Sequence, residues 1–217
     1  MIEAVIFDMD GLLIDSEPFW RRAQVFAFKT VGLKLTDDDM KQTMGRRIDE
    51  VVEHWYHERP WTGASQKDIE ALIVDKVIEL VNSEGVAMPG MFEVLDMLKG
   101  RNMPMAIASS SYPEIIDAVV QKLGIESYFD HIYSAVHETY GKPHPGVFIS
   151  TAATLGIKPS RCMVFEDSPS GVLAAKAAKM WCVAVPEESN KNHKFIQTAD
   201  LILESLSQFD EKTLTDF

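Results

Sequence analysis

The pattern of apolar and polar positions changes its period along the 217-residue chain. A short apolar run, Ala4 to Phe7, ends at a glycine-containing turn, which is the pattern of a buried parallel strand. Helical spacing follows, with no convincing strand between its segments, over residues 17–32, 37–43, 47–58 and 66–83. Thr36 and Ser65 are expected to cap the second and fourth of these helices, because acidic residues occupy the turn after each.

The pattern changes again after Pro89-Gly90, where short apolar runs alternate with helical stretches. Strands are predicted at residues 105–108, 131–134, 163–165, 182–185 and 201–203, and helices near 91–100, 113–123, 145–156 and 170–179. Such alternation predicts a parallel sheet with crossover helices on both faces. Because the first strand belongs to this sheet, the sequence predicts an α/β fold: a Rossmann-like core of residues 1–14 and 86–217, interrupted by an all-helical cap of residues 15–85.

Composition narrows the classes of partner. The chain is 46% hydrophobic and 25% charged, as in ordinary soluble globular proteins, and its formal net charge is −12. That charge disfavours binding to nucleic acid or to an anionic membrane surface. Cys162 and Cys182 are too few for a disulfide framework, and neither a signal segment nor a long apolar run is evident. We expect a cytoplasmic protein that acts as a monomer.

Four groups of polar residues follow predicted strands or lie in the loops between them. They are Asp8 with Asp10, the run Ser109-Ser110-Ser111, Lys142 in a Gly-Lys-Pro-His-Pro segment, and the run Glu166-Asp167-Ser168. In open α/β sheets, the carboxyl ends of the strands face the ligand crevice. The sequence therefore predicts that these groups meet there.

Together the four groups suit phosphoryl transfer. A carboxylate can attack phosphorus to give an aspartyl-phosphate, and Asp8, the first residue after the strand, is the natural nucleophile. Asp10 suits the acid that protonates the leaving oxygen and the base that later activates water. Carboxylate oxygens are ligands that Mg²⁺ prefers. Asp167, Lys142 and Ser109 would hold or supply the charges and donors that stabilise the phosphoryl oxygens.

Each group also has an ordinary structural interpretation, and for Asp8 and Asp10 it is a solvated turn that ends in glycine. The serine run at 109–111 suits the cap of a helix beginning near Pro113, although a helix start also offers amides to a phosphate. Lys142 taken alone is typical of a solvated surface lysine. Glu166 and Asp167 suit the acidic first turn of a helix.

The order and spacing of the four groups resemble the haloacid dehalogenase superfamily of phosphohydrolases. The resemblance covers nearly the whole chain and rests on the segments DMDGLLIDSE, IASSS, GKPHPGVF and VFEDSPSGVLAAKAA. It implies that Asp8 is the nucleophile and Asp10 the acid/base. It also implies a phosphoryl site formed by Ser109, Ser110 and Lys142, and a Mg²⁺ site formed by Asp8, the Asp10 carbonyl oxygen and Asp167, with Glu166 ligating the metal or lying beside it.

The cap resembles a narrower group, the bacterial hexitol phosphatases and 2-deoxyglucose-6-phosphate phosphatases. The segments that carry this resemblance are residues 17–20, 44–49 and 55–61. Glu17, Arg46 and Arg47 are candidates to meet sugar hydroxyls or a phosphate, and Trp20 to stack on a sugar ring. Trp55 and Trp61 are expected in the interior of the cap.

These observations predict a Mg²⁺-dependent phosphatase that acts on small sugar or sugar-alcohol phosphates through an aspartyl-phosphate, beneath a mobile cap. A phosphorylated metabolite is the expected partner, with no nucleic acid and no membrane. Two alternatives remain. One is a phosphotransferase of the β-phosphoglucomutase type, whose motifs and cap position are similar but whose first cap helix carries a histidine where Trp20 stands. The other is a phosphoacceptor signalling domain.

Overall fold

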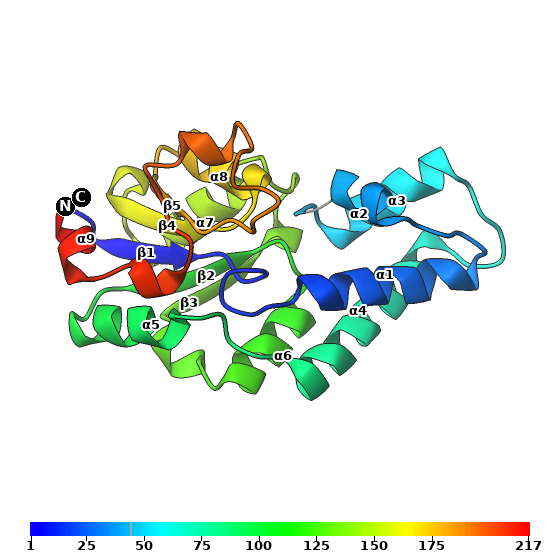
Figure 1. Ribbon diagram of the computed structural model, residues 1–217, viewed down its shortest axis with the longest axis horizontal. Coiled ribbons are helices and arrows are strands. Elements are labelled where there is room, and N and C mark those ends of the chain that lie inside the picture. The colour runs from blue at the N-terminus through cyan, green and yellow to red at the C-terminus, as the bar shows by residue number, and fades with distance from the viewer. Residues whose placement is uncertain (44) are drawn as a thin grey trace.

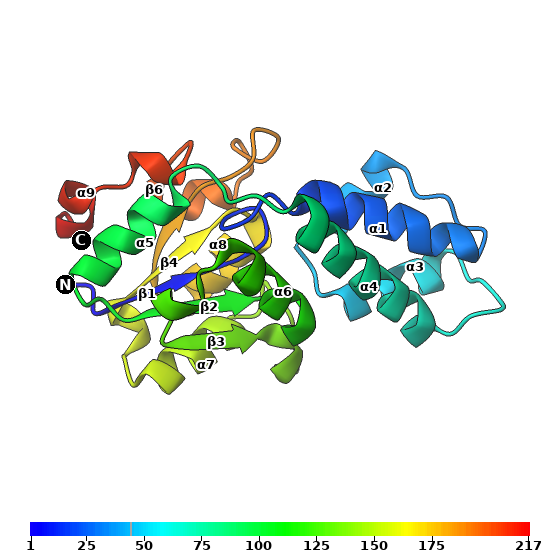
Figure 2. The same ribbon diagram turned by 90° about the horizontal axis from the view of Figure 1, so that it is seen from below.

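The computed structural model describes residues 1–43 and 45–217 and has two parts, a layered α/β part and a group of helices at one end of it (Figure 1). Both chain termini lie at the end of the α/β part that is remote from the helical group, as Figures 1 and 2 show. No helix within the described ranges combines the length and apolar composition needed to cross a lipid bilayer.

The α/β part is built on a parallel sheet. Its described strands lie in the order β3-β2-β1-β4-β5-β6. They are β1 (Ala4–Phe7), β2 (Met105–Ser109), β3 (His131–Ser134), β4 (Cys162–Glu166), β5 (Trp181–Ala184) and β6 (Leu201–Ile202). In the register of the central strands, Phe7 is opposite Ile107 on one side and Phe165 on the other. The predicted Rossmann-like parallel sheet is confirmed.

The apolar strands are buried because both faces of the sheet are covered. Successive residues of β1 point to opposite faces, so Val5 and Phe7 join one apolar cluster while Ala4 and Ile6 join the other. Helices α5 (Met91–Gly100) and α6 (Pro113–Leu123) contribute to the first cluster, and α7 (Gly146–Leu155) and α8 (Pro169–Ala177) to the second.

The helical group consists of α1 (Glu17–Thr30), α2 (Asp37–Gln42), α3 (Ile48–Glu58) and α4 (Gln66–Glu84). Helix α4 packs against α1, α3 and α6, and so joins the group to the α/β part. Thr36 and Ser65 form complete capping boxes with Asp39 and Asp68, as predicted. Trp55 and Trp61 are buried, which confirms their expected place in the interior.

The chain passes between the two parts along a pair of short antiparallel segments. Ile14 bridges Ala87, the amide of Asp15 donates to the Val86 carbonyl at 3.3 Å, and the amide of Met88 donates to the Leu13 carbonyl at 3.0 Å. These contacts lie where the sequence predicts that the chain leaves the core, after residue 14, and returns to it, at residue 86. The division into a core and a separate cap domain is still a prediction, and this pairing marks where the chain passes from one part to the other.

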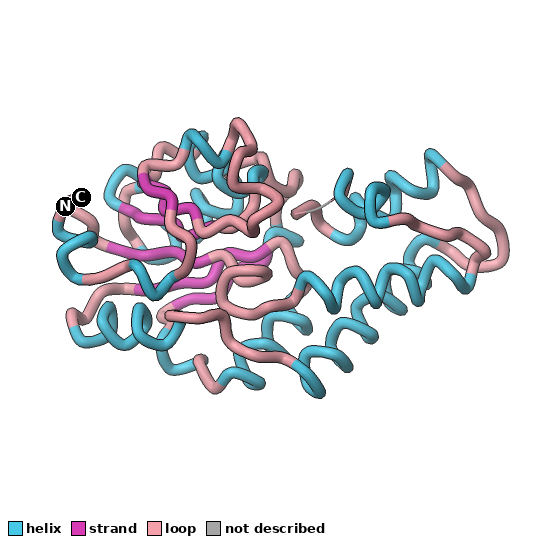
Figure 3. Tube along the Cα trace, viewed as in Figure 1, coloured by secondary structure: helices cyan, strands magenta, loops and turns pink. Residues whose placement is uncertain are grey.

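Several element bounds differ from the predicted ones by one or two residues, and one segment was not predicted. Strand β5 begins and ends one residue earlier than predicted, at Trp181 and Ala184. The carboxyl-terminal segment, for which no role was expected, forms a 3₁₀ turn and the short helix α9 (Glu211–Thr215), burying Leu206, Phe209 and Leu214 against the sheet. Figure 3 shows that the loops following β1 and β2 lie at the end of the sheet that faces the helical group.

Candidate active site

Three neighbouring strands bring the predicted core residues together. Asp8 follows β1 directly, and its amide donates to the Phe165 carbonyl of β4 at 2.9 Å. Ser109 and Glu166 are the last residues of β2 and β4, the two strands that flank β1. The groups predicted at the carboxyl ends of these strands therefore share one edge of the sheet.

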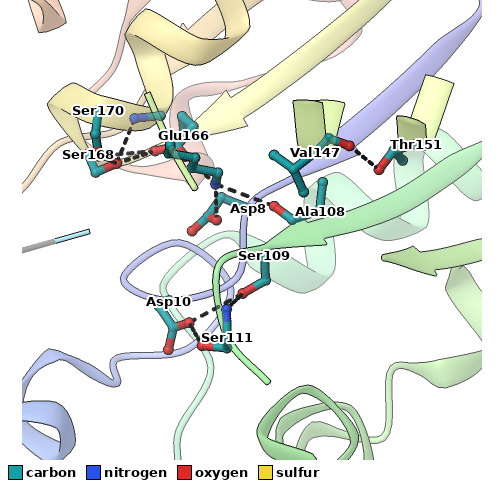
Figure 4. A network of polar contacts seen from close by, with 12 residues as sticks. Asp8, Asp10, Ala108, Ser109, Ser111, Val147, Thr151, Glu166, Ser168 and Ser170 are labelled. Atoms are coloured by element: carbon teal, nitrogen blue, oxygen red, sulfur yellow. Dashed lines mark hydrogen bonds and ion pairs between the residues drawn. The ribbon is translucent and has the colours of Figure 1, made fainter. Parts of the chain in front are cut away.

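A buried lysine joins two of the carboxylates. Lys142 Nζ lies 2.5 Å from Asp8 Oδ1 and 2.7 Å from Glu166 Oε1, and it also donates to the Ala108 carbonyl at 3.4 Å (Figure 4). Only 4% of Lys142 is exposed, and its ammonium lies over the ring of Phe148. Lys142 is thus a buried ion-pair partner and not a solvated surface lysine.

The charges of this cluster depend on one another. Burial raises the pKa of Asp8 to about 7, although the neighbouring Lys142 charge opposes the shift. Burial alone would lower the pKa of Lys142, but the carboxylates of Asp8 and Glu166 raise it above its ordinary value. Lys142 therefore stays protonated, and further positive charge beside Asp8 would favour its nucleophilic, ionised form.

Glu166 is fixed by residues of its own loop. Its Oε2 accepts from the Ser168 amide at 2.8 Å and from Ser168 Oγ at 2.9 Å, so Ser168 has a definite role in the site. A side chain at Gly171 would overlap this carboxylate, with Cβ only 1.6 Å from Glu166 Oε1. Glu166 consequently does more than begin a helix with negative charge.

Asp10 is held apart from this cluster by a set of donors. Its Oδ1 accepts from Ser16 Oγ at 2.6 Å and from Trp20 Nε1 at 2.8 Å, and its Oδ2 accepts from Ser111 Oγ at 2.7 Å. Figure 4 shows Asp10 facing Ser111, away from the group around Asp8. Sequence reasoning did not single out Ser16, and it placed Ser111 in the site without a role of its own. It expected Trp20 to stack on a sugar, and in the structure the indole N–H of Trp20 donates to the candidate acid/base.

The serine run does not cap the following helix. The residue at the amino-terminal cap of α6 is Tyr112, which makes no capping hydrogen bond through its side chain. Ser109 is fully buried and its Oγ accepts from the Ser111 amide at 3.0 Å, while Ser110 and Ser111 line the cavity above Asp8. Among the described residues, Ser110 Oγ is buried without a hydrogen-bond partner, which leaves it available to a bound group.

The cavity lies between the strand ends and the helical group. On the helical side it is lined by several of the expected specificity residues, namely Glu17, Trp20 and Arg46, and also by Arg21. Burial, followed by the charges of Glu187 and Asp10, raises the pKa of Glu17 to about 7. The helical side of the cavity therefore carries less negative charge at neutral pH than a fully ionised Glu17 would give it.

Arg47 does not line this cavity, contrary to expectation. Its guanidinium donates to the carbonyls of Ala135 and Glu138 at 3.1 and 2.8 Å, and it pairs with Asp49 at 2.6 Å. The neighbouring Glu50 accepts from the Gly141 amide at 3.1 Å. Arg47 thus ties α3 to the loop before Lys142, because backbone carbonyls there satisfy its donors. Met44, in the same expected segment, lies outside the described residues.

The remaining carboxylate of the cluster is suited to a cation. One oxygen from each of Asp8, Glu166 and Asp167 lies within 4.8 Å of the others. Asp167 is 7% exposed, and no hydrogen bond or ion pair within the described part of the chain involves its carboxylate. A Cβ on Gly11 would lie 2.3 Å from Asp167 Oδ2, so this oxygen sits against the backbone beside Asp10. The unpaired Asp167 oxygen, beside the lysine-paired carboxylates of Asp8 and Glu166, completes a set of hard oxygen ligands that fits Mg²⁺.

Comparison with known families agrees with this geometry. Residues 5–185 match the family model described as "Haloacid dehalogenase-like hydrolase". The chain belongs to this family. The match begins in β1 and ends just after β5, so it includes all four groups of candidate core residues.

Several named relatives of this haloacid dehalogenase-like hydrolase are phosphatases. The chain is 36% identical to hexitol phosphatase B of Escherichia coli K12 over 98% of its own length and 96% of that protein. It is 33% identical to the fructose-1-phosphate phosphatase YqaB of the same organism, over 83% and 95%. The crystal structure of CbbY from Rhodobacter sphaeroides with phosphate has the same fold, with a TM-score of 0.88 and 24% identity, covering 96% of each chain. This family member is therefore an enzyme of the phosphomonoester hydrolase type.

Proposed function

We propose that this enzyme hydrolyses small sugar or sugar-alcohol phosphates through an aspartyl-phosphate on Asp8, with Mg²⁺ as cofactor. The observation that carries the proposal is the buried cluster in which Lys142 pairs with Asp8 beside the unneutralised carboxylate of Asp167. A nucleophile, a fixed cation and a set of hard oxygen ligands at one point are what phosphoryl transfer requires.

In the first step an oxygen of Asp8 attacks phosphorus, the bond from phosphorus to the sugar oxygen breaks, and Asp10 gives its proton to that oxygen. In the second step Asp10 removes a proton from water, which attacks the same phosphorus and releases Asp8. Lys142 balances negative charge on the phosphoryl oxygens throughout. Mg²⁺ held by Asp8, Asp167 and the Asp10 carbonyl oxygen would add positive charge to the phosphoryl group.

Asp10 must leave some of its present donors to take part. Trp20 and Ser16 belong to the segment that enters α1, so a movement of this segment would change the hydrogen bonds to Asp10. The movement would also close the cavity over the substrate and exclude bulk water. Glu17 and Arg46 would then contact the leaving group, in keeping with the sugar and hexitol phosphates named for the relatives.

The contact between Trp20 and Asp10 bears on the alternative, a β-phosphoglucomutase-type phosphotransferase. Indole donates one hydrogen bond and has no group that titrates near neutral pH, so Trp20 can hold Asp10 but cannot exchange a proton with it. We therefore expect water, and not a second sugar phosphate, to accept the phosphoryl group. Membership of an enzyme family also argues against the phosphoacceptor signalling domain.

The test is phosphate release from a panel of hexose, pentose and hexitol phosphates, in Mg²⁺ and after treatment with EDTA. We expect many turnovers on several of these esters, loss of activity with EDTA and recovery with added Mg²⁺. Activity on phosphoglycolate or pyrophosphate alone would overturn the substrate class, and full activity without metal would overturn the cofactor.

A second assay separates hydrolase from mutase. β-Glucose 1-phosphate is incubated with Mg²⁺ and a trace of glucose 1,6-bisphosphate, and glucose 6-phosphate is followed with a coupled dehydrogenase. Isomerisation faster than phosphate release would contradict the proposal.

A further inference from the structure

Two arginines line the cavity on the side of the helical group. Arg21 lies on α1, and Arg46 lies in the turn between α2 and α3. Within the described ranges, neither guanidinium makes an ion pair or a hydrogen bond, whereas Arg22, next to Arg21, pairs with Glu84 at 2.7 Å. Unpaired cations facing one cavity from two elements favour a bound anion.

Both arginines line the cavity that also contains Asp10. Arg21 lies four positions after Glu17 on α1, and Trp20, whose indole N–H donates to Asp10 at 2.8 Å, lies three positions after Glu17. Arg46 follows Gly45, where a Cβ would lie only 2.8 Å from Ser170 Oγ at the start of α8. The two arginines therefore border the cavity from different elements, α1 and the turn before α3.

The phosphoryl group that is transferred does not account for these two charges. That group is expected at Lys142 and the Asp8–Asp167 carboxylates, on the floor of the cavity. Glu17 accounts for them only in part: the Arg21 charge favours its ionised form, but no hydrogen bond or ion pair joins the two side chains, and burial raises the pKa of Glu17 to about 7. The remaining substrate group that could meet Arg21 and Arg46 belongs to the leaving group.

We infer that Arg21 and Arg46 form a second anion subsite, so that the preferred substrates are sugar-derived phosphates whose leaving group carries its own carboxylate or phosphate. This inference rests on the proposed function and narrows its substrate class. Planar guanidinium groups bind both anions through paired hydrogen bonds, so the two sources share one chemistry.

A matched pair of ligands tests the subsite. A hexitol 6-phosphate and the corresponding hexonic acid 6-phosphate differ only at carbon 1, which is a hydroxymethyl group in one and a carboxylate in the other. We expect the wild-type kcat/KM to be at least about tenfold higher for the acid, the effect of one hydrogen-bonded charge. A hexitol 1,6-bisphosphate provides the arm that distinguishes a phosphate from a carboxylate.

The variants Arg21→Gln and Arg46→Gln should each lower the ratio of kcat/KM for the acid to kcat/KM for the hexitol phosphate by about tenfold, because the hexitol lacks the anion that the removed charge would bind. Arg22→Gln is the matched control, because it removes the same charge from the adjacent position of α1 and lies outside the cavity. Equal losses on every phosphate ester would show that the arginines only attract the substrate phosphate, and would overturn the inference.

Binding provides a readout that does not depend on turnover. Titration calorimetry with the Asp8→Asn variant compares the Kd of the two ligands, and we expect the acid to bind at least about tenfold more tightly. Equal Kd values would overturn the subsite even if wild type hydrolyses both esters. Tighter binding of the acid with no hydrolysis of any ester by wild type would instead support the subsite and contradict the proposed function.

Discussion

The two sides of the cavity differ in how their charged side chains are paired. We call the side formed by the strand ends the floor, and the side formed by the helical group the roof. On the floor, Lys142 lies between Asp8 and Glu166, and each of these contacts is buried. On the roof, Arg21 and Arg46 form no hydrogen bond or ion pair within the described part of the chain, although the Arg21 charge acts on Glu17. The floor is electrostatically organised before a substrate arrives, while the roof leaves charges to be satisfied by the substrate.

This difference corresponds to two tasks. Stabilising charge that develops on a phosphoryl group requires donors and cations that are already in place, because reorganising them would cost free energy at the moment of reaction. Choosing among leaving groups requires groups whose interactions depend on which leaving group is bound. Substitutions on the floor should therefore affect all substrates, and substitutions on the roof should change the ratio between substrates.

The largest effect is expected from Asp8→Asn. The amide is nearly the same size as the carboxylate but is a poor nucleophile, so phosphate release from every ester should fall by more than about ten-thousandfold. The exposed Asp15→Asn is the matched control and should keep its activity. Steady-state phosphate release and a thermal melt measure the two quantities, and near-wild-type turnover of a folded Asp8→Asn protein would remove Asp8 from its role.

Asp10→Asn is expected to have the next largest effect. Its amide oxygen can still accept a hydrogen bond from Trp20 but has no proton to give, so turnover of sugar phosphates should fall by about a hundred- to ten-thousandfold. The loss should be smaller with p-nitrophenyl phosphate, whose leaving group needs no proton. Equal losses on both ester types would exclude Asp10 as the acid.

Trp20→Phe keeps an aromatic ring and removes the indole donor. It should lower turnover by less than about tenfold, because Ser16 and Ser111 still donate to Asp10.

A third variant tests whether the floor depends on its paired charges. Lys142→Met leaves two buried carboxylates uncompensated, and breaking a buried pair in this way costs about 3–5 kcal/mol of unfolding free energy. Without Lys142, burial and mutual repulsion hold the pKa of Asp8 above its unfolded value, so stability should fall as pH rises and the deficit should shrink as pH is lowered toward 5. Urea unfolding at several pH values measures this, with Lys142→Met/Glu166→Gln expected to recover part of the loss. A deficit that is independent of pH would contradict the charge explanation.

Much of the fold was readable from local patterns. The buried strands appear as short apolar runs because both faces of the sheet are covered, and Thr36 and Ser65 mark helix starts because capping needs only residues three apart. The core site was readable for a related reason. Residues that follow parallel strands must share one edge of the sheet, so Asp8 and Glu166 were predicted to be neighbours although they are far apart in sequence.

The contacts that were missed depend on loop paths and not on local pattern. Ser111 reaches Asp10 across 101 positions of the chain, and Arg47 reaches Ala135 across 88. No spacing rule distinguishes Arg46 from Arg47, because which of two adjacent side chains faces a cavity depends on how the turn enters α3. The carboxyl-terminal segment was missed because helix α9 has only five residues. Phe209, which precedes this helix, is buried through a contact with Phe165, whose ring centroid lies 4.8 Å away, and that contact is remote in sequence.

The smallest expected effect concerns these two adjacent arginines. Arg47→Gln removes hydrogen bonds from a charged donor to the carbonyls of Ala135 and Glu138, and should lower the unfolding free energy by about 1–3 kcal/mol. Arg46→Gln loses no contact with the described residues and should stay within about 0.5 kcal/mol of wild type. The two substitutions remove the same charge from neighbouring positions. Urea unfolding of both variants at one pH therefore separates the effect of the lost hydrogen bonds from the effect of the lost charge.

The expected order is opposite for substrate choice, since Arg46→Gln should change the ratio between acid and hexitol phosphates more than Arg47→Gln. Equal stability of the two variants would mean that Arg47 does not hold α3 to the core, and the distinction between an anchored and an available arginine would fail.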